Sequence, residues 1–256
     1  MDLNIEDFAS NLMENGYSIK TIPNMVPIDN LRSNLSKWLR EKFFLTLPDE
    51  ELLNNIHIAA SINSEDTANT LTIDSIKHLS QTLSFDEIIY SSCKPYLNTL
   101  FGLDIHSQKG NNIVVQHPNS TRVAELHIDA PPTSPFEVVC WVPLVNCFKS
   151  KSFYIVNKKD TIILMEKYRG NSYQTWDHFK EDALRYVKNV EVSYGQVLFF
   201  SSCLLHGSHI NETNETRWCI NTRFKSLFAP SGMHDVMTYY RVLSIGPLTD
   251  IGLKLK

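Results

Sequence analysis

Residues 195–224, GQVLFFSSCLLHGSHINETNETRWCINTRF, decide the fold class of this chain. The two ends of this stretch, residues 195–200 and 217–224, are rich in β-branched and aromatic residues, whereas the segment between them holds serine, asparagine, threonine and glycine. Short runs of this kind, separated by turn-forming residues, are typical of β-strands. The stretch therefore predicts two strands joined by a turn-rich connection.

The same pattern extends from about residue 110 to residue 228. Five further runs predict strands, at residues 111–118, 136–145, 152–156, 161–167 and 189–194. Residues 172–188 interrupt them and favour one helix. Many short strands at regular spacing favour a sandwich or barrel that hides its sheet edges. We expect a double-stranded β-helix of the jelly-roll type.

The first hundred residues show helical spacing instead. Four large apolar residues recur at intervals of three or four, namely Leu31, Leu35, Trp38 and Leu39. They predict an amphipathic helix, which Asp29 or Asn30 would cap. Further helices are expected at residues 47–60, 73–83 and 86–102. Pro95 should kink the last of these or mark its start.

Helices followed by strands predict an α+β fold, with helices packed on one face of a mainly antiparallel sheet. No linker or repeat divides the chain, so residues 1–256 are expected to form a single domain. Within it, residues 1–108 would be a mainly helical scaffold, residues 109–228 the jelly-roll core and residues 229–256 a C-terminal extension.

Composition excludes several classes of protein. The 24 basic and 28 acidic residues give a net charge of -4, and no concentrated basic run suggests a nucleic-acid partner. Four spread lysines are expected on a solvated strand edge or loop: Lys149, Lys151, Lys158 and Lys159. No apolar run reaches the roughly 20 residues that span a bilayer, and the acidic N-terminal stretch does not resemble a signal peptide. We therefore expect a cytoplasmic protein without membrane insertion.

The five cysteines are odd in number and none is paired at CxxC spacing, which argues against a disulfide framework and a zinc knuckle. Chemistry is expected elsewhere, at His127 and Asp129. On a strand, residues two apart point to the same face, so the imidazole and the carboxylate can approach one metal ion. His206 can supply a third ligand.

Two histidines and one carboxylate on one face leave three metal positions open, which is the arrangement that non-haem iron(II) oxygenases use. Two open positions accept a chelating 2-oxo acid and the third accepts dioxygen. Arg217 follows His206 by eleven residues and lies in the next predicted strand. A chelated 2-oxoglutarate needs a cation for its distal carboxylate, and arginine provides two parallel hydrogen bonds.

This pattern of HxD, a later histidine and an arginine about ten residues beyond resembles the iron(II)/2-oxoglutarate oxygenases. Residues 195–200 before LLHGSH are similar to the phytanoyl-CoA dioxygenase-like branch. Three stretches resemble the oxygenases of bacterial surface-carbohydrate gene clusters: residues 127–156, 221–230 and 243–253. The resemblance implies iron(II), 2-oxoglutarate and dioxygen, and hydroxylation of a sugar or sugar conjugate.

Three residues are further candidates for contacting 2-oxoglutarate. The related branch uses polar residues at the position of Gln116, for which a plain strand-end residue is the alternative. Ser152 and Tyr154 lie two apart on one predicted strand and share a face, although ordinary strand alternation would place them in the same way.

The face of Arg217 extends to Asn221 and Arg223 by the same period of two. Asn221 is a candidate for the cofactor, and Arg223 for the cofactor or the substrate. Glu125 shares the expected face of His127 and could orient a substrate hydroxyl. His209, at an odd spacing from His206, is expected on the opposite face.

The sequence leaves two other hypotheses about function open. One is a zinc or manganese enzyme on a cupin-like barrel, which would need a third histidine near the HxD and would leave Arg217 unexplained. The other is a catalytically silent sugar-binding jelly roll. The N-terminal helices are expected either to cover the barrel or to form the interface of a homo-oligomer.

Overall fold

The computed structural model describes residues 5–62 and 64–255, which form helices and two antiparallel sheets. The expected α+β class is confirmed. The larger sheet has seven strands in the order β1-β7-β4-β9-β2-β10, with β3 paired to β9 as well. Its strands are β1 (Tyr17–Thr21), β2 (Ile105–Gln108), β3 (Asn112–Gln116), β4 (Val138–Pro143), β7 (Gln196–Ser201), β9 (Arg217–Ser226) and β10 (Tyr240–Ser244).

The smaller sheet has three strands in the order β6-β5-β8. They are β5 (Phe153–Ile155), β6 (Lys188–Val190) and β8 (His206–Gly207). An isolated antiparallel bridge between His127 and His206 adds the HxD segment to the free side of β8. This bridge places His206 and His127 side by side, although they are far apart in the sequence.

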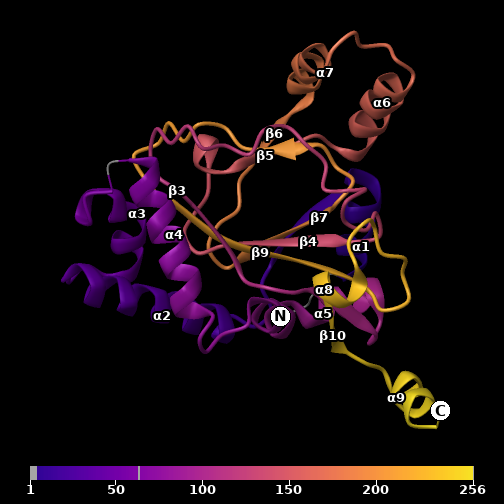
Figure 1. The fold of residues 1–256 in the computed structure, drawn as a ribbon, viewed down its shortest axis with the longest axis horizontal. Helices are drawn as coiled ribbons and strands as arrows, with labels where there is room; N and C mark the ends of the chain where they lie inside the picture. The colour runs from indigo at the N-terminus through magenta and orange to yellow at the C-terminus, as the bar shows by residue number, and fades with distance from the viewer. Residues whose placement is uncertain (1–4, 63, 256) are drawn as a thin grey trace.

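Nine α-helices surround these sheets in the described part of the chain. They are α1 (Ile5–Asn15), α2 (Val26–Phe43), α3 (Asp49–Ala59), α4 (Glu65–Leu79), α5 (Phe85–Phe101), α6 (Lys158–Arg169), α7 (Trp176–Ala183), α8 (Val236–Tyr239) and α9 (Pro247–Lys254). Short 3₁₀ turns lie at Lys149–Lys151 and Leu184–Tyr186. In Figure 1, α2, α3 and α4 gather at one end of the larger sheet, while α6 and α7 project from the side that carries β5 and β6.

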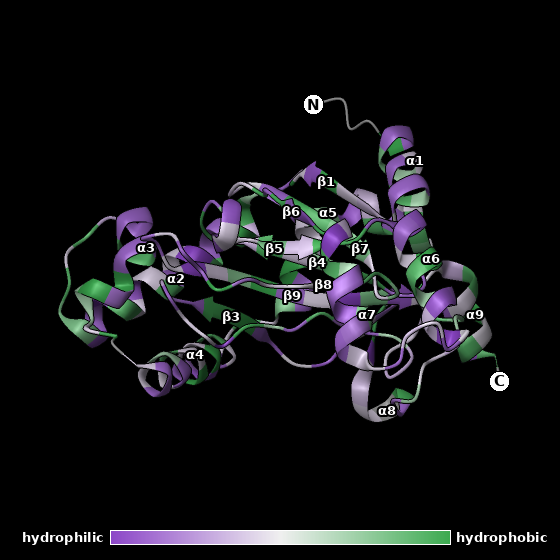
Figure 2. Cartoon of the chain, turned by 90° about the horizontal axis from the view of Figure 1, so that it is seen from above, coloured by the Kyte–Doolittle hydropathy of each residue, from purple (hydrophilic) through white to green (hydrophobic). Residues whose placement is uncertain are grey.

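The core forms where the helices meet the larger sheet. Phe8 of α1 is fully buried against Tyr96 of α5 and Phe199 of β7, with ring centroids 4.8 and 4.9 Å apart. The helix α5 packs on β9, and α4 packs on the edge strand β3. Helices such as α4 carry both hydrophilic and hydrophobic residues (Figure 2), so one face can enter the core while the other meets water.

Several boundaries differ from the sequence predictions. The second helix begins at Val26, with Met25 and not Asp29 or Asn30 at its N-cap, because Pro27 is well suited to a first helical turn. Pro95 lies inside α5 and does not start it. The carbonyl of Ser91, which cannot accept from a proline, accepts from the Asn24 amide at 3.5 Å instead.

The strand predicted at residues 161–167 is wrong, because this segment belongs to helix α6. The Asn157 side chain accepts from the backbone N–H of Asp160 at 2.9 Å and caps the helix. Thr161 and Leu164, three residues apart, are its buried residues, which is a helical spacing. The helix predicted over residues 172–188 is shorter than expected, covering α7 and a 3₁₀ turn.

Three strands of the larger sheet, and β8 of the smaller sheet, were not predicted. The larger sheet takes β1 and β2 from the N-terminal half and β10 from beyond residue 228, so it reaches outside the predicted core range 109–228. Among the described residues, no helix is both long and apolar enough to cross a membrane.

Candidate metal centre

The HxD segment is held by backbone hydrogen bonds rather than by a regular strand. The N–H of His127 donates to the carbonyl of His206, and the N–H of His206 donates back, both at 2.9 Å. The N–H of Asp129 donates to the carbonyl of Ser202 at 3.0 Å. The segment was expected to be a strand, but it forms one bridge and is otherwise extended and held by these hydrogen bonds. The side chains of His127 and Asp129 still lie on the same side.

Within the described residues, one group of histidine, cysteine and acidic side chains could hold a metal ion: His127, Asp129 and His206. One ligand atom from each lies within 4.8 Å of the others. The imidazole rings are 4.2 Å apart between centroids, and the Nε2 of His127 is 3.6 Å from the Oδ1 of Asp129.

The orientation of both imidazoles fits metal binding. The Nδ1 of His127 lies 2.7 Å from the carbonyl oxygen of Glu125, and the Nδ1 of His206 lies 2.9 Å from that of Leu204. A carbonyl oxygen can only accept, so each Nδ1 carries a proton, which leaves Nε2 as the atom of each ring that can bind a metal ion. A carbonyl behind the imidazole is the usual support of a metal-binding histidine.

The electrostatics of the three groups are consistent with this role. Burial raises the pKa of the Asp129 carboxyl, but the hydrogen bond with His127 and the charge of Arg223 outweigh burial and hold it well below its usual range. Burial, aided by the charge of His127, lowers the pKa of His206 to about 4, so its ring is neutral at pH 7. The hydrogen bond with Asp129 raises the pKa of His127 despite burial.

Arg223 is the ionic partner of Asp129. Its Nη2 and Nε donate to the Oδ2 of Asp129 at 2.8 and 3.2 Å, and its Nη1 donates to the Oε1 of Gln108 at 2.9 Å. The side chains of Arg223 and Asp129 are only 16% and 9% exposed. Since Arg223 occupies Oδ2, the Oδ1 of Asp129 is the oxygen that faces His127.

The three groups line a cavity of about 160 Å³ between the two sheets. Trp141, Phe153 and Phe200 form its apolar wall, and the ring of Phe200 lies edge-on to His206 at 4.9 Å. Polar side chains from three segments complete the lining, namely Asn112, Ser208, Arg217, Asn221 and Arg223. The common face expected for Arg217, Asn221 and Arg223 on β9 is therefore present.

Arg217 is buried in this cavity with a free donor. Arg217 is only 5% exposed, and its Nη1 donates to the backbone carbonyl of Ser152 at 2.9 Å. Its Nε has no hydrogen-bond partner among the described residues. A buried guanidinium with an unused donor fits an incoming carboxylate, which would satisfy both its charge and its hydrogen bond.

Three other candidates, Ser152, Tyr154 and Gln116, do not line the cavity. Ser152 is fully buried, its hydroxyl donates to the carbonyl of Val190, and it meets Arg217 through its backbone. Tyr154 packs on His209 at 4.6 Å between ring centroids, outside the cavity lining. Gln116 donates to the carbonyl of His209 and lines a neighbouring cleft.

Glu125 does not share the face of His127 in the structure. Its side chain is 70% exposed and pairs with Lys180 of α7 at 3.2 Å. The segment before His127 is not a strand, so the period of two does not carry back to it. No sequence pattern singled out Trp141 and Phe200, which line the cavity. Their cavity-facing role follows from alternation along β4 and β7, since Phe199 points the other way.

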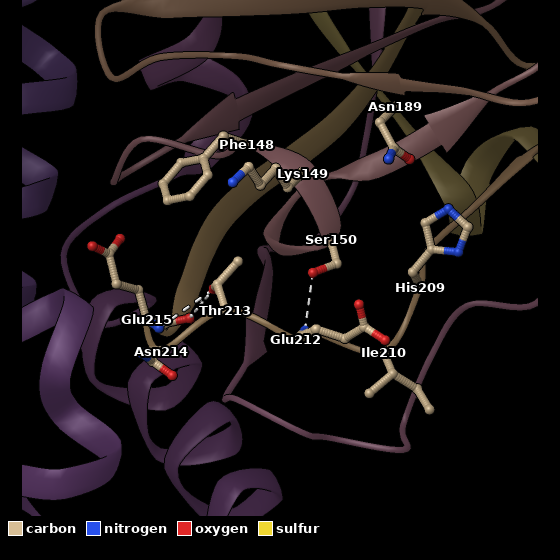
Figure 3. Close-up of a pocket in the computed structure, with 10 residues that line it drawn as sticks. All are labelled: Phe148, Lys149, Ser150, Asn189, His209, Ile210, Glu212, Thr213, Asn214 and Glu215. Carbon is tan, nitrogen blue, oxygen red and sulfur yellow. Dashed lines mark hydrogen bonds between the residues drawn. The ribbon is translucent and has the colours of Figure 1, made fainter.

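A larger cleft, of about 920 Å³ (Figure 3), is lined by none of the three triad residues. It is open, and it is lined by loops around Ser150, His209 and Glu212. Several of its polar groups bond to each other, for example the hydroxyl of Ser150, which accepts from the N–H of Glu212 at 3.0 Å. Within residues 5–62 and 64–255, the one group of potential metal ligands lines the smaller cavity.

No family model and no curated protein matches this chain. Solved structures do. The non-heme monooxygenase ThoJ, in a nickel complex, is 12% identical with a TM-score of 0.55, covering 94% of this chain and 84% of its own. The epimerase SnoN, in complex with Fe³⁺, alpha-ketoglutarate and nogalamycin RO, is 13% identical with a TM-score of 0.51, covering 91% and 88%.

This chain shares their fold. A third structure, EvdMO1, is 12% identical with a TM-score of 0.54, and the match covers 87% of this chain and 50% of that one. At such identities the likeness concerns the fold alone. The case for a metal centre therefore depends on the geometry of His127, Asp129 and His206.

Proposed function

We propose that this protein is an iron(II)- and 2-oxoglutarate-dependent dioxygenase that hydroxylates a small molecule. One observation carries the proposal: a triad whose three ligand atoms lie within 4.8 Å of one another shares a cavity with Arg217, whose buried guanidinium has an unused donor. A metal-binding module would need only the triad. An acceptor of 2-oxo acids needs both.

His127, Asp129 and His206 would hold the iron through Nε2, Oδ1 and Nε2. Arg217 would bind the distal carboxylate of 2-oxoglutarate, with the carbonyl of Ser152 fixing the guanidinium. The amide of Asn221, itself bonded to Asn112 at 2.8 Å, lies on the same face. When bound, the iron would activate dioxygen, which would take two electrons from the 2-oxo acid, giving succinate and carbon dioxide, and two from the substrate that is hydroxylated.

The protein itself would orient the metal ligands and keep water out of the cavity. The carbonyls of Glu125 and Leu204 fix the tautomers, Arg223 fixes the carboxylate, and the aromatic wall excludes water from the cavity. We further propose that the two sheets form a double-stranded β-helix and that residues 1–256 are one domain.

For the substrate we propose a sugar or sugar conjugate of surface-polysaccharide biosynthesis. The resemblance of residues 127–156, 221–230 and 243–253 to oxygenases of such gene clusters supports it. A zinc or manganese enzyme of cupin type remains the second reading. It is less well supported, because it gives the buried donor of Arg217 no task.

The test is succinate formation. Purified protein is incubated in air with iron(II), 2-oxoglutarate and a panel of sugars, nucleotide sugars and glycolipids, and succinate is measured. We expect at least one compound to stimulate succinate formation, with loss of activity in His206→Ala. His209→Ala, three residues further and outside the cavity, is the matched control and should keep it. Turnover that survives in His206→Ala, or that needs zinc and no 2-oxoglutarate, would contradict the proposal.

A further inference from the structure

The cavity of the metal centre is small for a substrate. Its volume of about 160 Å³ is below the roughly 300–1,000 Å³ of pockets that enclose a whole drug-sized ligand. A 2-oxo acid reaching from the triad to Arg217 would occupy much of it. A substrate must therefore extend into a neighbouring space.

One neighbouring cleft, of about 310 Å³, shares two wall residues with the cavity: Val114 of β3 and Ala124 of the segment before His127. Val114 lies on a strand whose sole sheet partner among the described residues is β9. Ala124 is tied to Ser208, which donates its N–H to the Ala124 carbonyl at 2.8 Å. The cleft thus lies where an edge of the larger sheet faces the HxD segment.

Helix α4 forms the outer wall of this cleft. Glu65, Asn69 and Thr72 line it at intervals of four and three, which places them on one face of the helix. The guanidinium of Arg122 donates to the Oδ1 of Asn69 from the opposite side. Glu65 accepts from the backbone N–H of Thr121 at 2.9 Å, so the polar wall is fixed by its own contacts.

At the inner side of the cleft lies a buried acceptor without a donor. Gln116 is 1% exposed, and its Nε2 donates to the carbonyl of His209. Its Oε1 has no partner in the described part of the chain. Leaving a buried acceptor without a donor is unfavourable, so a hydroxyl donor placed there would be favoured.

The charged residues of the cleft favour some classes of ligand over others. The cleft holds one guanidinium and one carboxylate, Arg122 and Glu65, beside amides, a hydroxyl and the apolar floor of Ile113 and Val115. A phosphate or nucleotide group would call for several cations without an opposing carboxylate. Hydroxyl groups both donate and accept, which suits this mixture.

We propose that the cleft between α4 and β3 binds the part of the substrate remote from the reacting carbon, and that this part is an uncharged, hydroxyl-rich ring. The inference rests on the proposed function, because it takes the triad as the reacting end. It also narrows that function, since the group in the cleft is neutral even if the substrate carries a charge elsewhere.

The experiment measures ligand binding and not turnover. The full chain, loaded with Ni²⁺ and 2-oxoglutarate, is probed by saturation-transfer NMR with a panel of neutral methyl glycosides and disaccharides. Glucose 1-phosphate and UDP-glucose serve as charged competitors. The variants are Thr72→Val, which lines the cleft, and Thr70→Val, its matched control.

The two threonines differ only in their position on α4. Both hydroxyls donate to a helix carbonyl at 2.9 Å, that of Thr72 to Ala68 and that of Thr70 to Asp66, but Thr70 is exposed and outside the cleft. We expect a neutral glycoside to bind, Thr72→Val to weaken it about 5- to 10-fold for one lost hydrogen bond, and Thr70→Val to leave it unchanged.

The proposal is overturned if no neutral glycoside binds, if Thr72→Val weakens the phosphorylated sugars but no neutral glycoside, or if both variants behave alike. The affinity for 2-oxoglutarate, measured by calorimetry on the same proteins loaded with Ni²⁺ alone, separates the failure of this proposal from the failure of the proposed function. A 2-oxo acid that binds without any glycoside refutes only the cleft. A protein that does not bind the 2-oxo acid refutes the proposed function itself.

Discussion

The ion pair between Arg223 and Asp129 should be one of the strongest couplings in the metal-free protein. The guanidinium makes two hydrogen bonds to one carboxylate oxygen, at 2.8 and 3.2 Å, and both side chains are largely buried. Removing one partner of a buried pair costs about 3–5 kcal/mol, since the other charge is left uncompensated. Residual exposure of Arg223 reduces this, so we expect Arg223→Ala to lose about 3 kcal/mol.

A double-mutant cycle isolates the pair from the other contacts of Arg223. The hydrogen bond from its Nη1 to Gln108 is lost in both backgrounds and cancels. With Asp129→Asn as the second change, we expect a coupling free energy of about 2 kcal/mol. The assay is urea unfolding of protein kept in a chelator, followed by tryptophan fluorescence.

A second cycle provides the control. Glu125 and Lys180 also form a pair beside His127, but Glu125 is 70% exposed, so their coupling should not exceed about 1 kcal/mol. If the Arg223 and Asp129 changes add to within about 0.5 kcal/mol, the pair does not hold the carboxylate. The account of how Oδ1 is turned toward His127 would then fail.

Three further predictions concern the rest of the fold. Burial raises the pKa of Asp86, but hydrogen bonds from Arg241 and nearby serines outweigh it and lower the pKa. The resulting stability is present above the ordinary pKa of about 4 and lost as pH falls through the lowered one. Asp86→Asn should thus cost about 2 kcal/mol at pH 7 and clearly less at pH 3 in urea unfolding, and an equal loss at both would contradict this. Burial raises the pKa of the Cys147 thiol to about 12, whereas Cys203 is half-buried. Ellman's reagent at pH 8 should therefore label one thiol of the native protein and none in the Cys203→Ser variant. Labelling that persists in that variant would show that another thiol is accessible. Phe8→Ala should lower the unfolding free energy by about 3–5 kcal/mol, and a loss under 1 kcal/mol would mean that α1 is not part of the core.

Local periodicity in the sequence predicted the structural features that depend on a single strand. Alternation along residues 217–223 placed Arg217, Asn221 and Arg223 on a single face, and all three line the cavity. The strand runs were recognisable because β-branched and aromatic residues gather in them. Both features depend on residues that are close together in the chain, so the sequence alone can predict them.

What depends on distant partners was not predictable in this way. Arg223 was considered for the cofactor or substrate, because nothing near it in sequence names Asp129 as its partner. Lys151 was expected in solvent, yet it is fully buried, with its Nζ 2.6 Å from Glu215 and 2.8 Å from Asn54. The short apolar run of α6 fits a strand or a helix equally, and the cap at Asn157 decides between them.

The central claim is that the triad and Arg217 together bind iron(II) and 2-oxoglutarate. The most direct measurement is an anaerobic titration of the metal-free protein with both, followed by the weak visible absorption of an iron(II)–2-oxo-acid chelate. Arg217→Ala is compared with Arg169→Ala, an exposed arginine at the end of α6. We predict the band in all three proteins, with the affinity for 2-oxoglutarate lowered about 10- to 100-fold in Arg217→Ala alone. Iron binding without a chelate band, or an equal affinity in both variants, would contradict the claim.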